Sequence, residues 1–202
     1  MSALACLAVC VLAWGAPAAR FDFKGVVIGE PATPQDIEDK FKDEDPFALP
    51  KGLNADPSFQ QGRAALKQHF AVKCGVGAGA GGLYVCNGAV TVAGAYSDMN
   101  ILIGTDGIVQ RIRLPFEARS FSDVEAAVLQ KFGKPTKSTH EVVQNRMGGS
   151  FDNVTHYWIG ANKTEVMLTQ YAGSLDESLL LFSTEAERKM REDLQKKNAR
   201  DL

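Results

Sequence analysis

The sequence predicts an α+β protein with two α/β-meander halves, whose helices pack on one face of an antiparallel sheet. Two segments, residues 33–41 and 121–132, have the pattern of capped amphipathic helices, and each ends in a phenylalanine. Each precedes runs in which apolar and polar residues alternate with a period of two, as in half-buried strands. Short turn signals separate these runs, so antiparallel pairing is expected within each half.

Composition limits the class of protein. The chain has 202 residues, of which 45% are hydrophobic and 23% charged, as in ordinary folded proteins. Its net charge of -2 provides no field that would attract nucleic acid or anionic lipid. Neither is therefore expected as a partner.

Residues 1–18 are expected to be a signal peptide. The apolar run ACLAVCVLAWGA has the length of a signal-peptide core, and small residues before Ala19 predict cleavage there. No Lys or Arg precedes the run, and a buried N-terminal helix is the alternative. Lipid attachment at Cys10 is disfavoured because Val9, not a small residue, precedes it. No other apolar run is long enough to span a membrane, so the mature chain is expected to lack a membrane span and to be periplasmic or secreted.

The first half is expected to cover residues 19–116. A strand and a turn lead to a helix with Thr33 as its N-cap, Pro34 at its first position, and Ile37 and Phe41 on one face.

An acidic, proline-rich exposed loop follows at residues 42–57, and then a second short helix at 58–70. Ser58 and Gln61 form a capping-box pattern for this helix. Its expected apolar face consists of Phe59, Leu66 and Phe70.

Strands joined by tight turns are expected between Leu83 and Phe116, with a hairpin at Asp106 and Gly107 because glycine accepts the positive φ of such a turn.

The second half is expected to cover residues 117–183. Its helix has a capping-box pattern at Ser122 and Glu125, and Gly133 ends it. Its expected core face consists of Phe121, Val124, Val128 and Phe132. Three strand-like runs follow at 153–159, 165–171 and 178–183.

A charged C-terminal helix is expected over residues 184–202, with Thr184 and Glu187 as its cap pair. Its apolar stripe is restricted to Ala186, Met190 and Leu194, so the helix is expected to be mostly solvated.

The stretch CGVGAGAGGLYVC, residues 74–86, contains a formal G-x-G-x-x-G match. A dinucleotide site needs a helix after these glycines, but the following residues have the pattern of a strand, so no cofactor is expected. Removal of residues 1–18 would leave Cys74 and Cys86 as a pair in an exported chain. A disulfide that closes this loop is therefore predicted.

No catalytic or metal site is evident from motifs. The three histidines have no partner at helical spacing: His69 lies beside a helix face, His140 in a polar loop and His156 on a strand. Ser150 lacks the G-x-S-x-G spacing of a nucleophile elbow, and glycines 148 and 149 before it predict a turn. A site that joins Ser150 to distant His and Asp residues stays open.

Three aromatic residues are candidates for an interface: Tyr157, Trp158 and Tyr171. Alternation places Tyr157 and Trp158 on opposite faces of the sheet, so one is expected in the core and the other at the surface. An exposed aromatic on a sheet is a recurrent protein-binding anchor, and packing against the helices is the alternative.

The segments VVIGEPATPQDIEDKF and FSDVEAAVLQKFGKP, with a turn glycine at Gly29, resemble the start of the repeat in SmpA/OmlA-type outer-membrane assembly lipoproteins. They also resemble the two-repeat β-lactamase inhibitory proteins. The start FDFKG and the segment KFGKPT resemble those of a broader group of proteobacterial exported proteins. The chain departs from these families in its lack of a lipobox, its insertion at 42–57 and its cysteine pattern. The resemblance implies helices on one face of an antiparallel sheet and an extracytoplasmic binding role, and assigns no functional residue.

These features favour a non-catalytic binding module that contacts a protein of the cell envelope through its sheet or its acidic loop. Two alternatives remain: an exported hydrolase with a long-range Ser/His/Asp site, and an inhibitor of a secreted or periplasmic hydrolase.

Overall fold

The computed structural model describes residues 20–48, 56–77, 82–160 and 162–200, so the expected signal peptide lies outside the described residues. The helices are α1 (Pro34–Phe41), α2 (Pro57–His69), α3 (Phe121–Phe132) and α4 (Glu185–Arg200), with a 3-10 turn η1 (Ala118–Ser120). The strands are β1 (Asp22–Phe23), β2 (Val26–Val27), β3 (Lys73–Val76), β4 (Tyr84–Val92), β5 (Ala95–Ile103), β6 (Val109–Glu117), β7 (Lys137–Gln144), β8 (Ser150–Ile159), β9 (Glu165–Thr169) and β10 (Glu177–Ser183).

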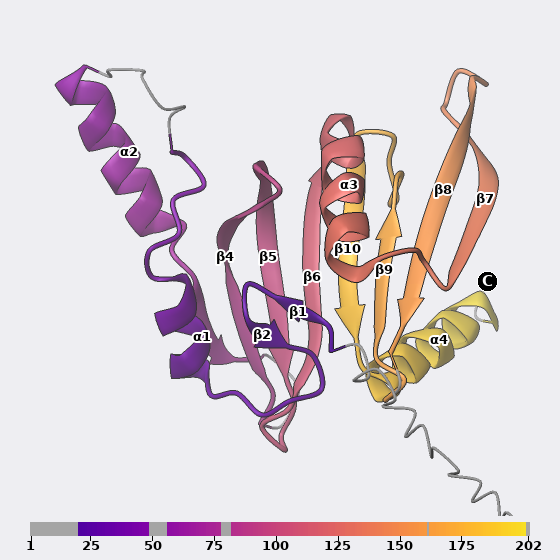
Figure 1. The fold of residues 1–202 in the computed structure, drawn as a ribbon, viewed down its shortest axis with the longest axis horizontal. Coiled ribbons are helices and arrows are strands. Elements are labelled where there is room, and N and C mark those ends of the chain that lie inside the picture. The colour runs from indigo at the N-terminus through magenta and orange to yellow at the C-terminus, as the bar shows by residue number, and fades with distance from the viewer. Residues whose placement is uncertain (1–19, 49–55, 78–81, 161, 201–202) are drawn as a thin grey trace, which may run out of the picture.

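One large antiparallel sheet organises the molecule. Its strand order is β3-β4-β5-β6-β10-β9-β8-β7, and a small β1-β2 hairpin forms a second sheet (Figure 1). Each half is a four-strand meander preceded by helix, and the two halves join through their last strands, β6 and β10. The α+β class and the two-meander organisation are therefore confirmed.

The first helix shows how local sequence positions an element. The Thr33 hydroxyl accepts a hydrogen bond from the Asp36 amide at 3.1 Å, and the Asp36 carboxylate accepts one from the Thr33 amide at 2.9 Å. This reciprocal capping starts α1 at Pro34, and Ile37 and Phe41 are buried against the sheet, as predicted.

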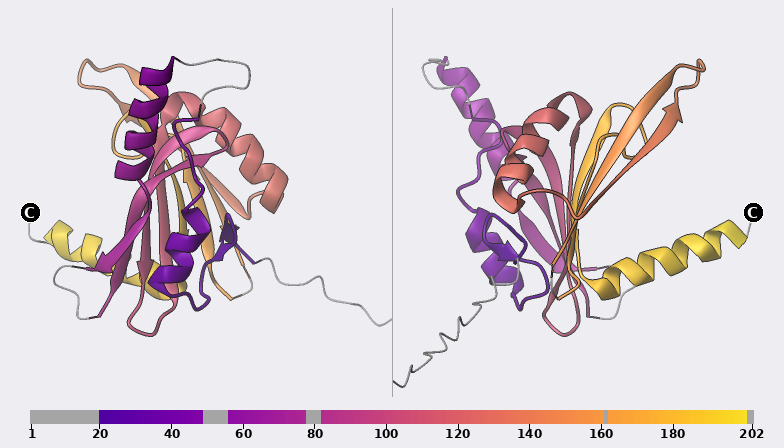
Figure 2. Two further views of the ribbon diagram at one scale, coloured as in Figure 1. Left: turned by 90° about the vertical axis from the view of Figure 1, so that its left-hand side faces the viewer. Right: turned by 45° about the vertical axis from the view of Figure 1, so that its right-hand side comes forward.

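The hydrophobic core lies on the sheet face that α1, α3 and the β1-β2 hairpin cover (Figure 2). Alternate residues of the two central strands point into it: Ile112 and Leu114 from β6, and Leu180 and Phe182 from β10. Aromatic side chains tie the layers together. The ring of Phe132 in α3 lies 5.2 Å from the ring of Phe21 and 6.1 Å from that of Phe182.

Helix α4 lies on the opposite face of the sheet and projects from it (Figure 2). The expected cap is present, because the Thr184 hydroxyl accepts a hydrogen bond from the Glu187 amide at 3.3 Å. The expected apolar stripe points into solvent, with Met190 48% and Leu194 52% exposed, whereas Glu187 is buried. The charged side of α4 therefore contacts the sheet.

Several local predictions were wrong. The N-cap of α2 is Asp56 rather than Ser58, and that of α3 is Ser120 without a side-chain cap bond. The predicted face of α2 is not buried, because this helix projects away from the sheet and leaves Phe59 52% exposed (Figure 1). His140 lies in β7 rather than in a loop.

Candidate binding face

The sheet face opposite α1 and α3, here called the open face, carries one continuous cross-strand row. Strand register places eight side chains in this row, from edge to edge: Lys73, Asn87, Asn100, Arg113, Leu181, Met167, Tyr157 and Lys137. The part from the first half is polar and cationic, and the part from the second half is largely apolar.

Hydrogen bonds connect the polar part of the open face. The Asn100 amide donates to Asn87 Oδ1 at 2.8 Å, and Asn100 Oδ1 accepts from the Arg111 guanidinium at 3.1 Å. Arg113 donates to Glu177 at 3.2 Å. A hollow of about 670 Å³ lies beside these groups, lined by His69, Lys73, Asp98, Arg113 and their neighbours. Donors and acceptors therefore stand side by side on this half.

The apolar part of the open face is incompletely covered. Leu181 is buried, Met167 and Tyr157 are half-buried, and Ile159 is 48% exposed. The Lys137 ammonium lies 5.8 Å from the centre of the Tyr157 ring, within cation–π distance. A hollow of about 500 Å³ separates these strands from α4, which lines it with Arg188 and Arg191 among others.

Helix α4 is attached to the open face by charge. Glu187, whose side chain is 1% exposed, accepts a hydrogen bond from Arg111 at 2.9 Å and lies 3.5 Å from Arg191. Arg188 pairs with Glu165 of β9 at 3.3 Å. Replacement of Glu187 would leave Arg111 and Arg191 without this carboxylate, whereas Arg188 and Glu165 form a separate pair.

The predicted aromatic interface residues are divided between the two faces. Trp158 is only 2% exposed, and its indole donates to the Gly133 carbonyl at 2.9 Å, which anchors β8 to the end of α3. Burial removes Trp158 from any surface. Tyr157 lies on the open face, as alternation requires.

Tyr171 lies near the other end of the same half. Its ring packs edge-to-face on Phe151, with 6.3 Å between the ring centres. It lines a hollow of about 490 Å³ between the β7-β8 and β9-β10 turns, together with Val143, Arg146 and Asp176 among others. Tyr171 is therefore accessible beside the open face.

A Ser–His–Glu chain lies on the helix-covered side, where motif analysis did not predict one. The Ser138 hydroxyl is 2.7 Å from His156 Nδ1, and His156 Nε2 is 2.7 Å from Glu125 Oε1. The three residues come from β7, β8 and α3, so no sequence spacing marks them. Ser150, the serine considered from sequence, instead pairs with Gln144 across the β7-β8 hairpin.

Two roles fit the geometry of these three residues. The hydrogen bonds could activate Ser138 as a nucleophile, or they could connect the helix to the sheet as a structural link. If the carboxylate fixes the proton on Nε2, Nδ1 accepts the hydroxyl proton. Ser138 is exposed on the edge strand, whereas His156 is mostly buried beside Trp158.

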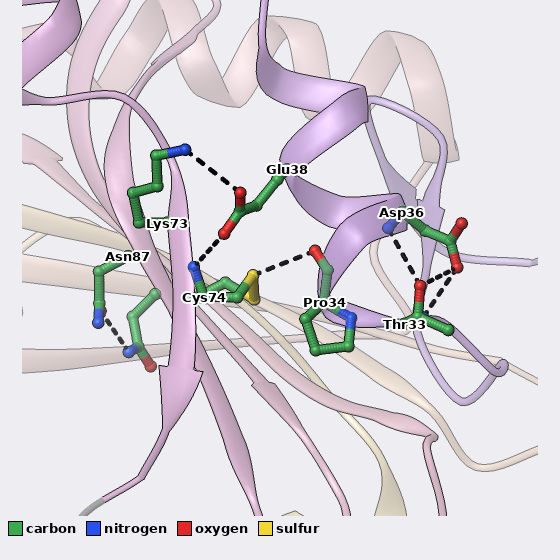
Figure 3. Close-up of a disulfide and its surroundings, with 9 residues drawn as sticks. Thr33, Pro34, Asp36, Glu38, Lys73, Cys74 and Asn87 are labelled. Carbon is green, nitrogen blue, oxygen red and sulfur yellow. Dashed lines mark hydrogen bonds and ion pairs between the residues drawn. A yellow bond between two sulfur atoms is a disulfide. The ribbon is translucent and has the colours of Figure 1, made fainter.

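The predicted disulfide is present. Cys74 and Cys86 lie directly opposite each other in β3 and β4, with 3.9 Å between their Cα atoms (Figure 3). Strand β4 follows the glycines, as predicted, in the position where a dinucleotide site would have a helix.

Glu38 of α1 binds the edge strand at the disulfide (Figure 3). It accepts hydrogen bonds from the Cys74 amide at 2.8 Å and the Lys73 ammonium at 3.3 Å. The amide bond first, and the ammonium second, lower the pKa of Glu38 below its ordinary value.

Within the described residues, no group of three or more His, Cys, Asp or Glu side chains is arranged to hold a metal ion. No helix in the same part of the chain is long and apolar enough to cross a membrane.

No protein-family model matches the chain, and no curated protein or solved structure shows significant similarity to it. The resemblance to exported repeat proteins therefore stays a prediction.

Proposed function

We propose that this protein is an exported, non-catalytic binding module that docks a protein of the cell envelope on its open face, in the periplasm or outside the cell. The observation that carries this proposal is the row across the sheet. At its apolar end Met167 and Tyr157, with Ile159 beside them, are partly uncovered, and its polar end offers hydrogen-bonding groups next to them. Protein interfaces combine an apolar centre that includes aromatics with polar surroundings in this way.

The chemistry of the face restricts the partner. Tyr157 and Ile159 call for apolar side chains, and the Lys137 ammonium calls for a carboxylate. The disulfide supports the proposed compartment, because such bonds persist in oxidising environments. The partner is therefore expected to be an envelope protein with an apolar patch edged by acidic groups.

Site-specific photocrosslinking tests this proposal. A photoreactive phenylalanine analogue replaces Tyr157 on the open face or, as the control, Leu129, which is 37% exposed on α3. Irradiation of cells that export the protein should crosslink one defined protein from position 157 and not from 129. Purified, that protein should bind Tyr157→Ala at least tenfold more weakly than wild type, and Leu129→Ala normally. Equal crosslinking from both positions, or normal binding by Tyr157→Ala, would contradict the proposal.

The same partner distinguishes the inhibitor alternative. If the captured protein is a hydrolase, its activity is measured with and without the purified chain. Loss of activity would make this protein an inhibitor, whereas unchanged activity would leave it a binding module.

The Ser–His–Glu chain favours a hydrolase as the second candidate. In that reaction, Ser138 Oγ would form a bond to the carbonyl carbon of an ester while His156 Nδ1 takes the hydroxyl proton and returns it to the leaving alcohol; water would then release the acid. Turnover of an activated ester such as p-nitrophenyl acetate should then fall at least a hundredfold in Ser138→Ala and stay normal in Ser150→Ala. Equal turnover by both variants would mean that the Ser–His–Glu hydrogen bonds have only a structural role.

A further inference from the structure

We infer that two copies of this chain form a symmetric dimer through β7, with the two β7 strands antiparallel and Thr139 on the twofold axis. The joined sheet would contain the strands of both copies, and their open faces would lie side by side. This inference does not rest on the proposed function, although the two share Lys137, which stands both at the end of the open-face row and on the sheet edge.

The two edges of the sheet differ. At one edge, β3 has four residues, and the disulfide and Glu38 of α1 tie it down. At the other edge, β7 has eight residues, Lys137–Gln144, and no described strand pairs with its outer side (Figure 1). It contains no proline, and Val142 is 69% exposed. A long exposed edge presents free amide and carbonyl groups that a second strand can pair with.

Sheet geometry restricts the register of such a pair. Residues directly opposite in antiparallel strands point to the same face, so a symmetric pair must be centred on a residue. A centre at Thr139 places Lys137 opposite Glu141 of the second copy, twice, and Ser138 opposite His140, twice. Both pairs suit side chains directly opposite in a sheet.

The neighbouring registers lack this match. A centre at His140 puts the two imidazoles opposite each other and Lys137 opposite Val143. A centre at Glu141 puts two carboxylates opposite each other, which is destabilising. Of these three registers, charge favours the one centred on Thr139.

The free chain leaves the required charges available. Within the described part of the molecule, no carboxylate lies within 4.0 Å of the Lys137 ammonium, although α4 and β9 carry acidic groups nearby. Glu141 accepts one hydrogen bond, from the Asn153 amide at 3.0 Å through Oε1, which leaves its second oxygen for a cation. The partner's Lys137 is a cation of the right charge at the right place.

Cysteine crosslinking tests the register in the whole mature chain. Thr139→Cys, His140→Cys and Glu141→Cys are made singly and exposed to a mild oxidant, because Cys74 and Cys86 are already paired with each other. Cα atoms opposite each other across antiparallel strands lie about 4.5–5.5 Å apart, close enough for a disulfide. Thr139→Cys should give a covalent dimer on a non-reducing gel at least fivefold faster than the other two. Equal rates, or the fastest rate at another position, would overturn the inference.

A charge exchange provides an independent test by analytical ultracentrifugation. Lys137→Glu and Glu141→Lys each replace two attractive pairs by repulsive ones, so each should raise the dimer Kd about tenfold or more. The double variant restores opposite charges across the axis and should return to within about twofold of wild type. A wild type that stays monomeric at about 100 μM, which corresponds to a dimer weaker than about -5.5 kcal/mol, would overturn the inference. A double variant that is folded by circular dichroism but associates as weakly as the single variants would also overturn it.

Discussion

Replacing Gly88 by alanine should destabilise the fold strongly, because the preceding segment crosses β4 at this residue. A Cβ on Gly88 would lie 2.5 Å from the Cα and 2.7 Å from the backbone nitrogen of Val72. Carbon atoms pack at about 3.5–4.0 Å, so the backbone around Val72 must move by about 1 Å or more. That movement strains the Ala89 amide to Phe70 carbonyl hydrogen bond, which is 2.8 Å long, and displaces Val72 from the core.

The magnitude follows from these contacts. Overpacking of this kind costs about 1–3 kcal/mol, and loss of the hydrogen bond costs about 1 kcal/mol more. Together they give about 2–4 kcal/mol, or a fall of roughly 5–15 °C in Tm for a chain of this length. Thermal unfolding followed by circular dichroism measures it.

The matched control is Gly75→Ala, in the neighbouring strand β3. A Cβ there meets nothing within 4 Å, so its Tm should change by less than about 2 °C. If Gly88→Ala melts within 2 °C of wild type, or if both variants lose the same stability, the close approach at Val72 is not what selects glycine.

Three further predictions concern other parts of the fold. The double variant Cys74→Ala/Cys86→Ala should lower the free energy of unfolding by about 3 kcal/mol, because the chain-entropy model gives this value for two cysteines 12 residues apart. Urea unfolding against the oxidised wild type measures it, and an unchanged midpoint would contradict the prediction. Trp158→Phe should lower the free energy of unfolding by about 2 kcal/mol, because the hydrogen bond to the Gly133 carbonyl is lost and the smaller ring leaves part of a buried site unfilled; unfolding at the wild-type midpoint would refute that role. Burial first, and then the hydrogen bond to Asp98, raise the pKa of Tyr96 to about 12. The folded state therefore holds this proton more tightly, and the contribution to stability is present below pH 10 and lost as the pH rises through 12. The ultraviolet difference between wild type and Tyr96→Phe should titrate near 12, and a midpoint near 10 would disprove the shift.

Elements set by neighbours in sequence could be predicted. The α1 cap, the helix at 121–132 and the hairpin turn at Asp106 and Gly107 depend on a few adjacent residues, and the structure has all three. The two edge strands were missed for a physical reason. Strand β7, with the sequence KSTHEVVQ, buries neither face deeply and lacks the apolar alternation of an inner strand. Strand β3 has only four residues.

Features that depend on distant residues could not be predicted. The sequence predicted a mostly solvated α4, but it gave no sign that Glu187 would be buried, because the partner of Glu187 is Arg111 on the distant strand β6. Glu125 likewise has the spacing of a helix cap, yet its carboxylate goes to His156 on β8. The open face likewise could be predicted only in part. Alternation separated Tyr157 from Trp158, but only strand register shows what stands beside Tyr157.

The pairing of β6 with β10 determines when folding can finish. This ladder has seven paired positions, whose sequence separation rises from 60 residues at Glu117↔Glu177 to 72 at Arg111↔Ser183. The other ladders of each meander join residues that are much closer in sequence. Contacts of high sequence separation close large loops and form late. As the chain is made from its N-terminus, β6 therefore waits with one edge unpaired until β10, near the C-terminus, has emerged. All residues of the first half are therefore synthesised long before β6 gains its partner β10. In that interval the unpaired edge of β6 can pair with the wrong strands.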